Sequence, residues 1–527
     1  MAPQRDMKSR NVWRMIYEYP FPCLTKRSLW GFLVAGLFNL ALAKGEFSLK
    51  PIELPSSDLL PKQSLHPVNV LGGPEKEFVR ISEGGELVIY AMEGERYVVA
   101  QNLVLPTPRE ANGKTYVGFG RLRPNAPYSI LLLMPEGLYA YGLAENRIED
   151  SPKLLIKKPM IQGQGGESSV QYFEFALDLD ADGMDELLLP ESEGFSIYRQ
   201  TAPLKFEPVA LPKSPFAHEK IFNLRRQTPD DPVRVSALSG WFSQRKGVDN
   251  LVLFDANQDK KIDLVYTSIL PGGRGKQVER YEIYYQQRGL RFPDSPSQVL
   301  ELDYDERAYV TFRDFNRDGR TDAVVLTSNY DIVNPRTVIR FYLAGSKPYQ
   351  FLSEPSDQLV TKDPIGLMAL GDFNGDGFCD FATTFFSYQF GSAEDIASLV
   401  VANKVRFRLQ FFLGKGGKVF SHQPDYAPQY TLNLKLDAYG GYQPFALVED
   451  MNGDGFMDLA IRSDENKLTI YTSEGKLSYP RQPSATIAVP SDANMDFVDL
   501  NEDGLTDLVV SSLQKHSVSV YFSVKKP

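Results

Sequence analysis

Strand-like segments recur along this chain, and each of them combines alternating side chains with a β-branched or aromatic end. Eight such segments align with one another: Leu87–Tyr90, Gly137–Tyr141, Phe195–Tyr198, Tyr281–Tyr285, Val338–Tyr342, Phe407–Phe412, Leu468–Tyr471 and Val518–Tyr521. Short alternating runs rich in these residue types are typical of β-strands. The pattern predicts an all-β fold built from eight copies of one unit.

Six of these copies contain the same nine-residue polar loop, of which Asp372-Phe-Asn-Gly-Asp-Gly-Phe-Cys-Asp380 is the clearest. Oxygen-bearing side chains occupy positions 1, 3, 5 and 9, and Gly377 at position 6 lets the backbone turn sharply. Ca²⁺ takes six to eight oxygen ligands, which alternate positions of a tight loop can direct to one point. The spacing predicts up to six structural Ca²⁺ ions.

The candidate ligands stand at positions 1, 3, 5 and 9 of each loop. In chain order they are Asp178, Asp180, Asp182, Glu186; Asp255, Asn257, Asp259, Asp263; Asp314, Asn316, Asp318, Asp322; Asp372, Asn374, Asp376, Asp380; Asp450, Asn452, Asp454, Asp458; Asp499, Asn501, Asp503, Asp507. Asp, Asn and Gly also favour ordinary turns, so a metal-free turn is the alternative. Six loops in register, each before an apolar strand, favour metal sites.

An EF-hand is the first rival for such a loop, and the sequence excludes it. That motif needs a bidentate Glu at position 12, between two helices. Position 12 carries no acid in any copy: it is Leu189, Tyr266, Val325, Thr383, Ile461 and Val510. The flanking segments also have the pattern of strands, so these loops belong to a β repeat.

The first two copies have lost this ligand pattern. Gly72–Glu77 and Gly120–Pro127 occupy the loop position, and the strands Phe78–Ile81 and Tyr128–Leu133 follow them. Terminal repeats are commonly atypical. Residues 66–165 are therefore expected to form two calcium-free units, and residues 170–527 six units with calcium loops.

The two ends of the repeat array complement each other. The last copy stops after Val518–Phe522 without a fourth strand, while Glu46–Glu53 is an extended segment without a copy of its own. Pairing these two would remove exposed sheet edges. We therefore expect residues 44–527 to form a single β-propeller of eight four-stranded blades, closed by an N-terminal strand. Seven blades is the alternative, if the first weak copy is only a cap.

The first 43 residues have the features of a secretory signal peptide. Six basic residues precede the 15-residue apolar run Leu29–Ala43, which ends in the small-x-small sequence Ala41-Leu-Ala43. This run is shorter than the roughly 20 residues of a spanning helix. The expected mature chain has no transmembrane segment and is exported, to the periplasm, the cell surface or the medium. An uncleaved anchor is the alternative.

Charge and cysteine content narrow the possible partners. The chain has a net charge of −10, and removal of residues 1–43, with six basic and two acidic residues, gives −14. The acids of the loops explain most of this balance, and no basic stripe suggests a nucleic-acid partner. Only Cys379 remains after cleavage, so no disulfide framework is possible. Calcium is the expected stabiliser instead.

The loop Asp-x-Asn-Gly-Asp-Gly-x-x-Asp, followed by an apolar and then an aromatic strand, resembles the FG-GAP/VCBS repeat family of bacterial-type secreted proteins. It is similar to the calcium-binding propeller of the integrin α-chain. The resemblance implies Ca²⁺ held by positions 1, 3, 5 and 9 and the position-7 carbonyl. Lys260 departs from the pattern, because it replaces glycine at position 6. We expect the Asp255 loop to bind calcium most weakly.

Two insertions interrupt the repeat, at residues 212–247 and 386–404, and the second contains a predicted short helix at Ser392–Val400.

The sequence contains no recognisable catalytic motif, and its four histidines are scattered. We therefore expect a binding module rather than an enzyme, with a protein or glycan ligand on one face of the propeller. The alternative is a carbohydrate-active enzyme that resembles propeller-fold polysaccharide lyases.

Overall fold

The structure is a computed structural model of the whole chain. It describes residues 47–52, 54, 63–107, 114–157, 169–191, 194–212, 225–226, 250–305, 308–328, 336–345, 347–361, 365–386, 404–415, 420, 423–433, 445–448, 450–475, 477–512 and 514–525. The predicted signal peptide and the predicted helix at Ser392–Val400 lie outside these residues. So does most of the 212–247 insertion.

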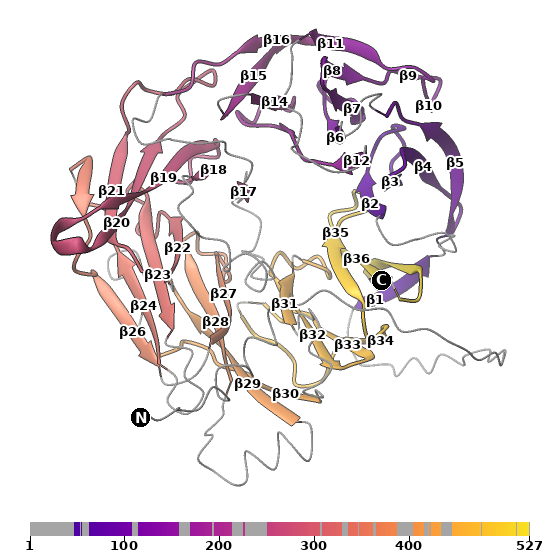
Figure 1. Cartoon of the computed structure of the whole chain (residues 1–527). Coiled ribbons are helices and arrows are strands. Elements are labelled where there is room, and N and C mark those ends of the chain that lie inside the picture. The colour runs from indigo at the N-terminus through magenta and orange to yellow at the C-terminus, as the bar shows by residue number, and fades with distance from the viewer. Residues whose placement is uncertain are drawn as a thin grey trace, which may run out of the picture.

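The regular secondary structure of the described residues is β-strand, as the sequence predicts, apart from one 3-10 turn at Gly273–Gly275. The strands form successive antiparallel groups of four, which we call units and number along the chain. The units follow one another around a ring (Figure 1). The first strand of a unit lies towards the centre of the ring, and its last strand towards the rim.

Units 1 to 4 occupy the first half of the chain. Unit 1 contains β2 (Gln63–Val68), β3 (Glu77–Ser82), β4 (Glu86–Glu93) and β5 (Arg96–Val104). Unit 2 contains β6 (Lys114–Gly120), β7 (Ser129–Met134), β8 (Gly137–Ala140) and β11 (Lys153–Lys157), with the small hairpin β9 (Leu143–Ala144) and β10 (Arg147–Ile148). Unit 3 contains β13 (Ala176–Leu177), β14 (Glu186–Glu191), β15 (Gly194–Ala202) and β16 (Lys205–Pro208). Unit 4 contains β18 (Asn250–Phe254), β19 (Asp263–Pro271), β20 (Gln277–Tyr284) and β21 (Gln298–Asp303).

Units 5 to 8 repeat this arrangement. Unit 5 contains β22 (Ala308–Arg313), β23 (Asp322–Ser328), β24 (Thr337–Tyr342) and β26 (Asp357–Thr361). Unit 6 contains β27 (Ile365–Gly371), β28 (Asp380–Phe386), β29 (Lys404–Phe412) and β30 (Gln429–Asn433). Unit 7 contains β31 (Phe445–Val448), β32 (Asp458–Asp464), β33 (Lys467–Tyr471) and β34 (Ala485–Ala488). Unit 8 contains β35 (Asn494–Val498), β36 (Asp507–Ser512) and β37 (Ser517–Lys525).

The fourth strand of unit 8 is β1 (Phe47–Ile52), from the other end of the described chain. It pairs antiparallel with β37, with Phe47 opposite Lys525 and Ile52 opposite Val520 (Figure 1). The two ends of the described chain are therefore joined by backbone hydrogen bonds within one sheet.

Three short strands add parallel pairs to the units. β12 (Ser169–Tyr172) pairs with β6, β17 (Arg225–Arg226) pairs with β18, and β25 (Tyr349–Phe351) pairs with β21. β12 and β17 thus cover the inner edges of units 2 and 4, and β25 covers the rim edge of unit 4. Open strand edges favour unwanted pairing with other chains, which such cover prevents.

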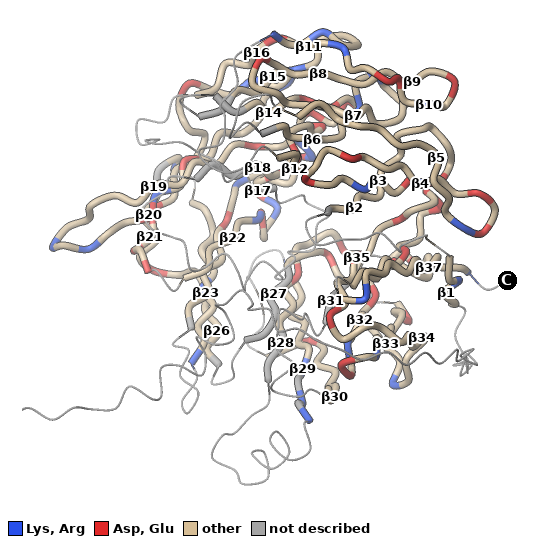
Figure 2. The backbone as a smooth tube through the Cα atoms, turned by 45° about the vertical axis from the view of Figure 1, so that its right-hand side comes forward, with Lys and Arg blue, Asp and Glu red and all other residues tan. Residues whose placement is uncertain are grey.

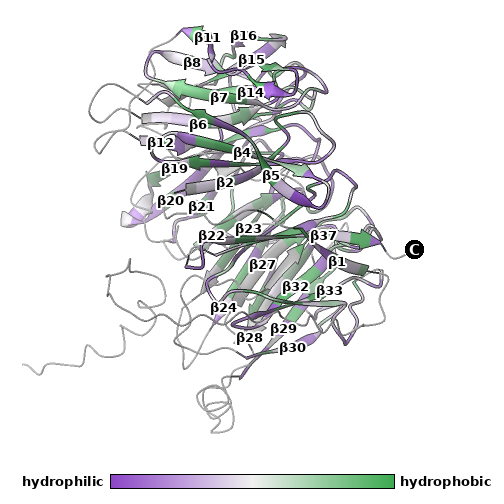
Figure 3. Ribbon diagram, turned by 90° about the vertical axis from the view of Figure 1, so that its right-hand side faces the viewer, coloured by the Kyte–Doolittle hydropathy of each residue, from purple (hydrophilic) through white to green (hydrophobic). Residues whose placement is uncertain are grey.

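The central strands are buried on both faces, which explains their nearly continuous apolar sequences (Figure 3). In β3, Val79 packs in a cluster with Ile130 and Leu132 of unit 2, whereas the adjacent Phe78 packs with Val509 and Val520 of unit 8. Similar clusters join units 2 to 6 in sequence, and units 7 and 8. Between units 6 and 7, the aromatic rings of Phe411 and Tyr479 stack.

Candidate metal centre

The six predicted calcium loops all connect the first strand of a unit to its second strand. Position 9 is in every case the first residue of that second strand: Glu186 of β14, Asp263 of β19, Asp322 of β23, Asp380 of β28, Asp458 of β32 and Asp507 of β36. The repeat of units therefore places the loops at equivalent points around the ring. The sequence alignment of the six loops is correct to the residue.

The loops share one backbone conformation. Positions 4 and 6 adopt positive φ in all six, for example 73° at Gly375 and 84° at Gly377. The carboxylate at position 1 accepts the N–H of position 6 at 2.6–3.0 Å in every loop. The carboxylate at position 5 accepts the N–H of position 7 at 2.8–3.0 Å. These hydrogen bonds hold the acidic side chains inside the curve of the loop.

The acid at position 9 fastens the two ends of each loop together. One of its oxygens accepts the N–H of position 2, at 2.8 Å from Phe373 to Asp380 and at 2.8–3.0 Å in the other loops. In units 4 to 7 the other oxygen accepts the N–H of the second residue after the third strand, such as Gly414 in unit 6 at 2.9 Å, and in unit 8 it accepts the N–H of Ser523 within β37. Positions 1, 3, 5 and 9 thus belong to one hydrogen-bonded loop.

The position-9 acids are fully buried, and this changes their acidity. Burial raises the pKa of Glu186 to about 8. It raises the pKa of the five aspartates, Asp263, Asp322, Asp380, Asp458 and Asp507, to about 7. A buried carboxylate is costly to ionise unless a positive charge lies beside it. A divalent cation would supply that charge, so the donor set of these loops fits Ca²⁺.

The loop of unit 3 brings three carboxylates closest together. One oxygen each of Asp178, Asp180 and Glu186 lie within 4.8 Å of one another. Asp180 Oδ1 and Glu186 Oε1 are buried and have no hydrogen-bond partner. These oxygens are therefore available to a metal ion.

Hydrogen bonds also connect loops of neighbouring units. The N–H of Ile262 donates to the Leu179 carbonyl at 3.1 Å, and the N–H of Thr506 donates to the Asp450 carbonyl at 2.8 Å. The N–H of Lys76 in unit 1 donates to the carbonyl of Leu500 in unit 8 at 2.7 Å. The guanidinium of Arg317 lies 5.2 Å from the centre of the Phe378 ring in the next loop. These contacts join the loops of units 3 and 4, 5 and 6, 7 and 8, and 8 and 1.

Unit 1 keeps one element of the loop that the sequence analysis did not identify. Glu77 is buried at position 9 and accepts the N–H of Val70 at 2.7 Å, as the other position-9 acids accept theirs. Positions 3 and 5 are Leu71 and Gly73, which supply no side-chain oxygen. The loss of the ligand pattern that the sequence predicts for this copy is therefore incomplete, because position 9 keeps its acid. Comparison of residue 77 with Asp263 and its equivalents could have found it.

The loop of unit 4 differs from its neighbours in the way its lysines are placed. Lys260 has φ of 70° but an exposed side chain. The next residue, Lys261, contacts a predicted ligand, because its Nζ lies 2.8 Å from Asp259 Oδ2. The positive charge that opposes a cation here comes from Lys261, and Lys260 contributes mainly an unfavourable backbone conformation.

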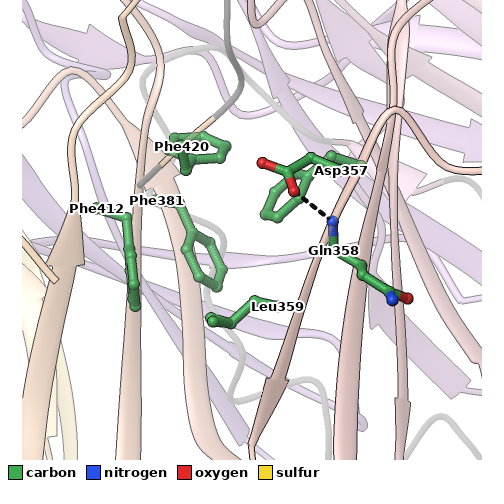
Figure 4. A pocket seen from close by; sticks show the side chains of 7 residues that line it. Asp357, Gln358, Leu359, Phe381, Phe412 and Phe420 are labelled. Carbon is green, nitrogen blue, oxygen red and sulfur yellow. Dashed lines mark hydrogen bonds between the residues drawn. The ribbon is translucent and has the colours of Figure 1, made fainter. Parts of the chain in front are cut away.

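A small apolar cavity lies between units 5 and 6, lined by Phe341, Leu359, Phe381, Phe412 and Phe420 (Figure 4). At the same place, Asp357 accepts the N–H of Gln358 at 2.8 Å. The volume of the cavity, about 10 Å³, is close to the space of one water molecule. The cavity is part of the packing between two units and is too small for an organic ligand.

Basic and acidic residues are interspersed over the described backbone (Figure 2). The hairpin of β19 and β20 projects from the ring and carries Arg274 and Lys276 at its tip. Among the described residues, no helix has the length and apolar character that a membrane crossing requires.

Comparison with known proteins gives one match to a family profile and distant likenesses to a number of solved structures. No curated protein matches the chain. A lectin from Agrocybe aegerita, solved for its recognition of non-reducing terminal N-acetylglucosamine, aligns at 13% identity over 85% of this chain and 100% of its own, with a TM-score of 0.38. The N-terminal domain of Nup159 aligns at 9% identity over 90% and 95%, with a TM-score of 0.30. Neither likeness is close enough to support an argument about the ligand.

The sequence match concerns the end of the chain. A family profile described as an FG-GAP-like repeat matches residues 450–510. This stretch begins with the loop of unit 7 and includes the loop of unit 8. The chain therefore carries an FG-GAP-like repeat at residues 450–510.

Proposed function

We propose that this protein is an exported, calcium-stabilised β-propeller of eight blades that serves as a binding module for a protein or a glycan. Each unit is one blade in this proposal, and β1 closes the ring by completing unit 8. The packing of Phe78 in unit 1 against Val520 in unit 8 supports this arrangement.

The repeated loop is the observation that carries the proposal. It holds three or four carboxylate or amide side chains in one curve, above a buried position-9 acid whose pKa is raised. Calcium bound by oxygen ligands on all sides is structural, whereas catalysis by a metal needs an open position. The metal sites therefore stabilise the blades, and ligand binding falls to the faces and connecting loops, where function commonly resides.

The test uses the chain from Lys44 to Pro527 on a glycan array and a protein array, in calcium and in chelator. We expect calcium-dependent binding to one class of ligand, together with calcium binding in calorimetry. Asp376→Ala should weaken ligand binding and lower the melting temperature together. Turnover of an acidic polysaccharide with release of unsaturated sugars would contradict the binding role and favour the lyase-like alternative.

A further inference from the structure

The six loops are internal copies of one another, so their differences can be compared position by position. At position 3 five loops carry an amide, and only the loop of unit 3 carries a carboxylate, Asp180. With Asp178, Asp182, Asp185 and Glu186, this loop holds five acids. It therefore has more negative charge than any of the other five.

A second difference occurs in the same unit. The strand register pairs Leu187 with Tyr198 in unit 3, as it pairs Leu264 with Tyr284 and Ala323 with Tyr342 in the next two. Arg199 follows Tyr198. Its equivalents in units 4 to 8 are uncharged: Tyr285, Leu343, Leu413, Thr472 and Phe522. One extra anion and one extra cation thus occur together in a single unit.

The structure brings these two side chains into contact. Arg199 Nε lies 3.7 Å from Asp180 Oδ2, and the Asp180 side chain is 9% exposed. Arg199 Nε is buried and has no hydrogen-bond partner. The same holds for Asp180 Oδ1 and Glu186 Oε1 in the 178–186 loop. The guanidinium also reaches the boundary with unit 4, since Arg199 Nη1 would lie 3.5 Å from a Cβ added at Gly289.

We propose that Arg199 sets the cation affinity of the 178–186 loop, with its positive charge offsetting the additional carboxylate of Asp180. This inference rests on the proposed calcium binding by the loops. Arg199 stands at the edge of the site as a fixed positive charge and is not itself a ligand. It lowers the affinity for a divalent cation, and it neutralises the acids when no metal is bound.

A probe at this loop separates it from the other five. Met184→Trp places an indole at position 7, where Phe378 and Phe456 stand in two sister loops, so an aromatic residue is accommodated. Tb³⁺ has the oxygen preference of Ca²⁺, and an adjacent indole excites its emission. The concentration of Tb³⁺ at half-saturation of this emission measures the 178–186 loop alone, once the signal of the unmodified chain is subtracted.

In the Met184→Trp background, Arg199→Leu should lower the Tb³⁺ concentration at half-saturation about tenfold, because a nearby positive charge is removed from a partly buried site. Arg199→Lys keeps the charge and should bind as the parent does. Arg147→Leu, at an exposed site on β10, is the control and should have no effect. The tenfold gain in Tb³⁺ affinity of Arg199→Leu should be smaller in 1 M salt, where charges are strongly screened.

Unchanged half-saturation in Arg199→Leu, or the same gain in Arg199→Lys, would overturn the inference. If Arg199→Leu folds poorly by circular dichroism, the pair Asp180→Asn and Asp180→Asn/Arg199→Leu gives the same comparison, since the double variant has an amide at position 180 and an uncharged residue at position 199, as the sister units have at the equivalent positions. Absence of emission in the Met184→Trp parent would overturn the proposed metal binding itself, which distinguishes the two failures. Competition by Ca²⁺ should follow the same order of variants.

Discussion

Single residues decide how well each loop can hold a cation, and the unit 4 loop shows two separate effects. Lys260 has a left-handed backbone, which costs a non-glycine residue about 1 kcal/mol or more whether or not metal is bound. Lys261 instead pairs with the position-5 carboxylate of Asp259 and competes with a cation for it. The two lysines should therefore respond differently to substitution.

Lys260→Gly should raise the melting temperature in calcium and in chelator alike, because the strain is present in both states. Lys261→Met should increase calcium affinity at this loop and raise the melting temperature only in calcium. Differential scanning calorimetry with and without EDTA separates the two cases. A gain for Lys260→Gly in calcium alone would show that the charge of Lys260, and not its backbone, is the cause.

His66 on β2 is a residue that should make stability depend on pH. Its ring stacks on Tyr172 with centroids 3.7 Å apart, and burial lowers its pKa from 6.5 to about 4. The unfolded chain then binds a proton that the native protein does not, between about pH 4 and pH 6.5. The contribution of His66 is complete above pH 6.5 and is lost as the pH falls through this window.

The difference in melting temperature between the natural chain and His66→Gln should therefore change between pH 7.5 and pH 4.5. Relative to His66→Gln, the natural chain should melt at a lower temperature at pH 4.5 than it does at pH 7.5. Both proteins are measured in saturating calcium, so that the loop carboxylates contribute equally. A constant difference across this range would mean that His66 has the same pKa in the folded protein as in the unfolded chain.

Among the elements, β1 has a special position because it completes the sheet of unit 8 across the chain ends. Its two buried apolar ends face different clusters: Phe47 packs with Val510 and Leu508, and Ile52 packs with Val520 and Phe78. The strand therefore joins the interfaces on both sides of unit 8.

Ile52→Ala should destabilise the protein by about 2–4 kcal/mol, the usual cost of truncating a buried isoleucine. Lys50→Ala in the same strand removes only an exposed ion pair with Glu95 and should change stability by less than about 0.5 kcal/mol. Chemical denaturation of both variants tests this difference. If Ile52→Ala changed stability as little as Lys50→Ala does, β1 would not contribute to the stability of the ring.

For the whole molecule, the proposed metal sites would together have one large effect on stability. Extracellular calcium modules have a Kd of roughly 10⁻⁴–10⁻³ M. At about tenfold excess over Kd each proposed site would contribute roughly 1.4 kcal/mol, and six sites would contribute on the order of 8 kcal/mol. This is comparable to the net stability of an ordinary domain. Chelation should therefore lower the melting temperature steeply, and an unchanged melting temperature in EDTA would mean that the loops are ordinary turns.

The metal-free protein should also have a distinct pH profile. The pKa values of the buried position-9 acids are raised, to about 7 for Asp380 and about 8 for Glu186, above those of the unfolded chain. Their favourable contribution is then complete at low pH and is lost as the pH rises through 7 to 8. In EDTA the melting temperature should be lower at pH 8.5 than at pH 6, and saturating calcium should remove this decrease. A rise in EDTA over the same interval would contradict the burial of these acids.

The proposed export also concerns the whole chain. If residues 1–43 are removed as a signal peptide, the protein recovered from its native compartment begins at or near Lys44. Intact-mass measurement decides the point. Recovery of a membrane-bound chain that begins at Met1 would favour the uncleaved anchor.

The sequence by itself determined the all-β class, the third strand of each unit and the positions of the candidate ligands in the six loops. These features are local: alternation defines a strand, and the two glycine-favouring positions of the loop fix the spacing of Asp372, Asn374 and Asp376. Position 9 was also predictable, because Asp380 and its equivalents follow the turn at a constant distance. Glu77 was not recognised as a position-9 acid, because the other positions of its loop differ from the repeat pattern.

Only the tertiary structure decided which side chains of distant segments meet, within one unit or between two. Arg199 lies in a strand 19 residues after Asp180, and nothing in the spacing shows that the two are in contact. The packing of Phe78 against Val520 and of Val79 against Ile130 likewise depends on how successive sheets face each other. The burial that raises the pKa of the position-9 acids has the same origin. Contacts between distant segments arise from the packing of sheets, and local sequence patterns do not encode that packing.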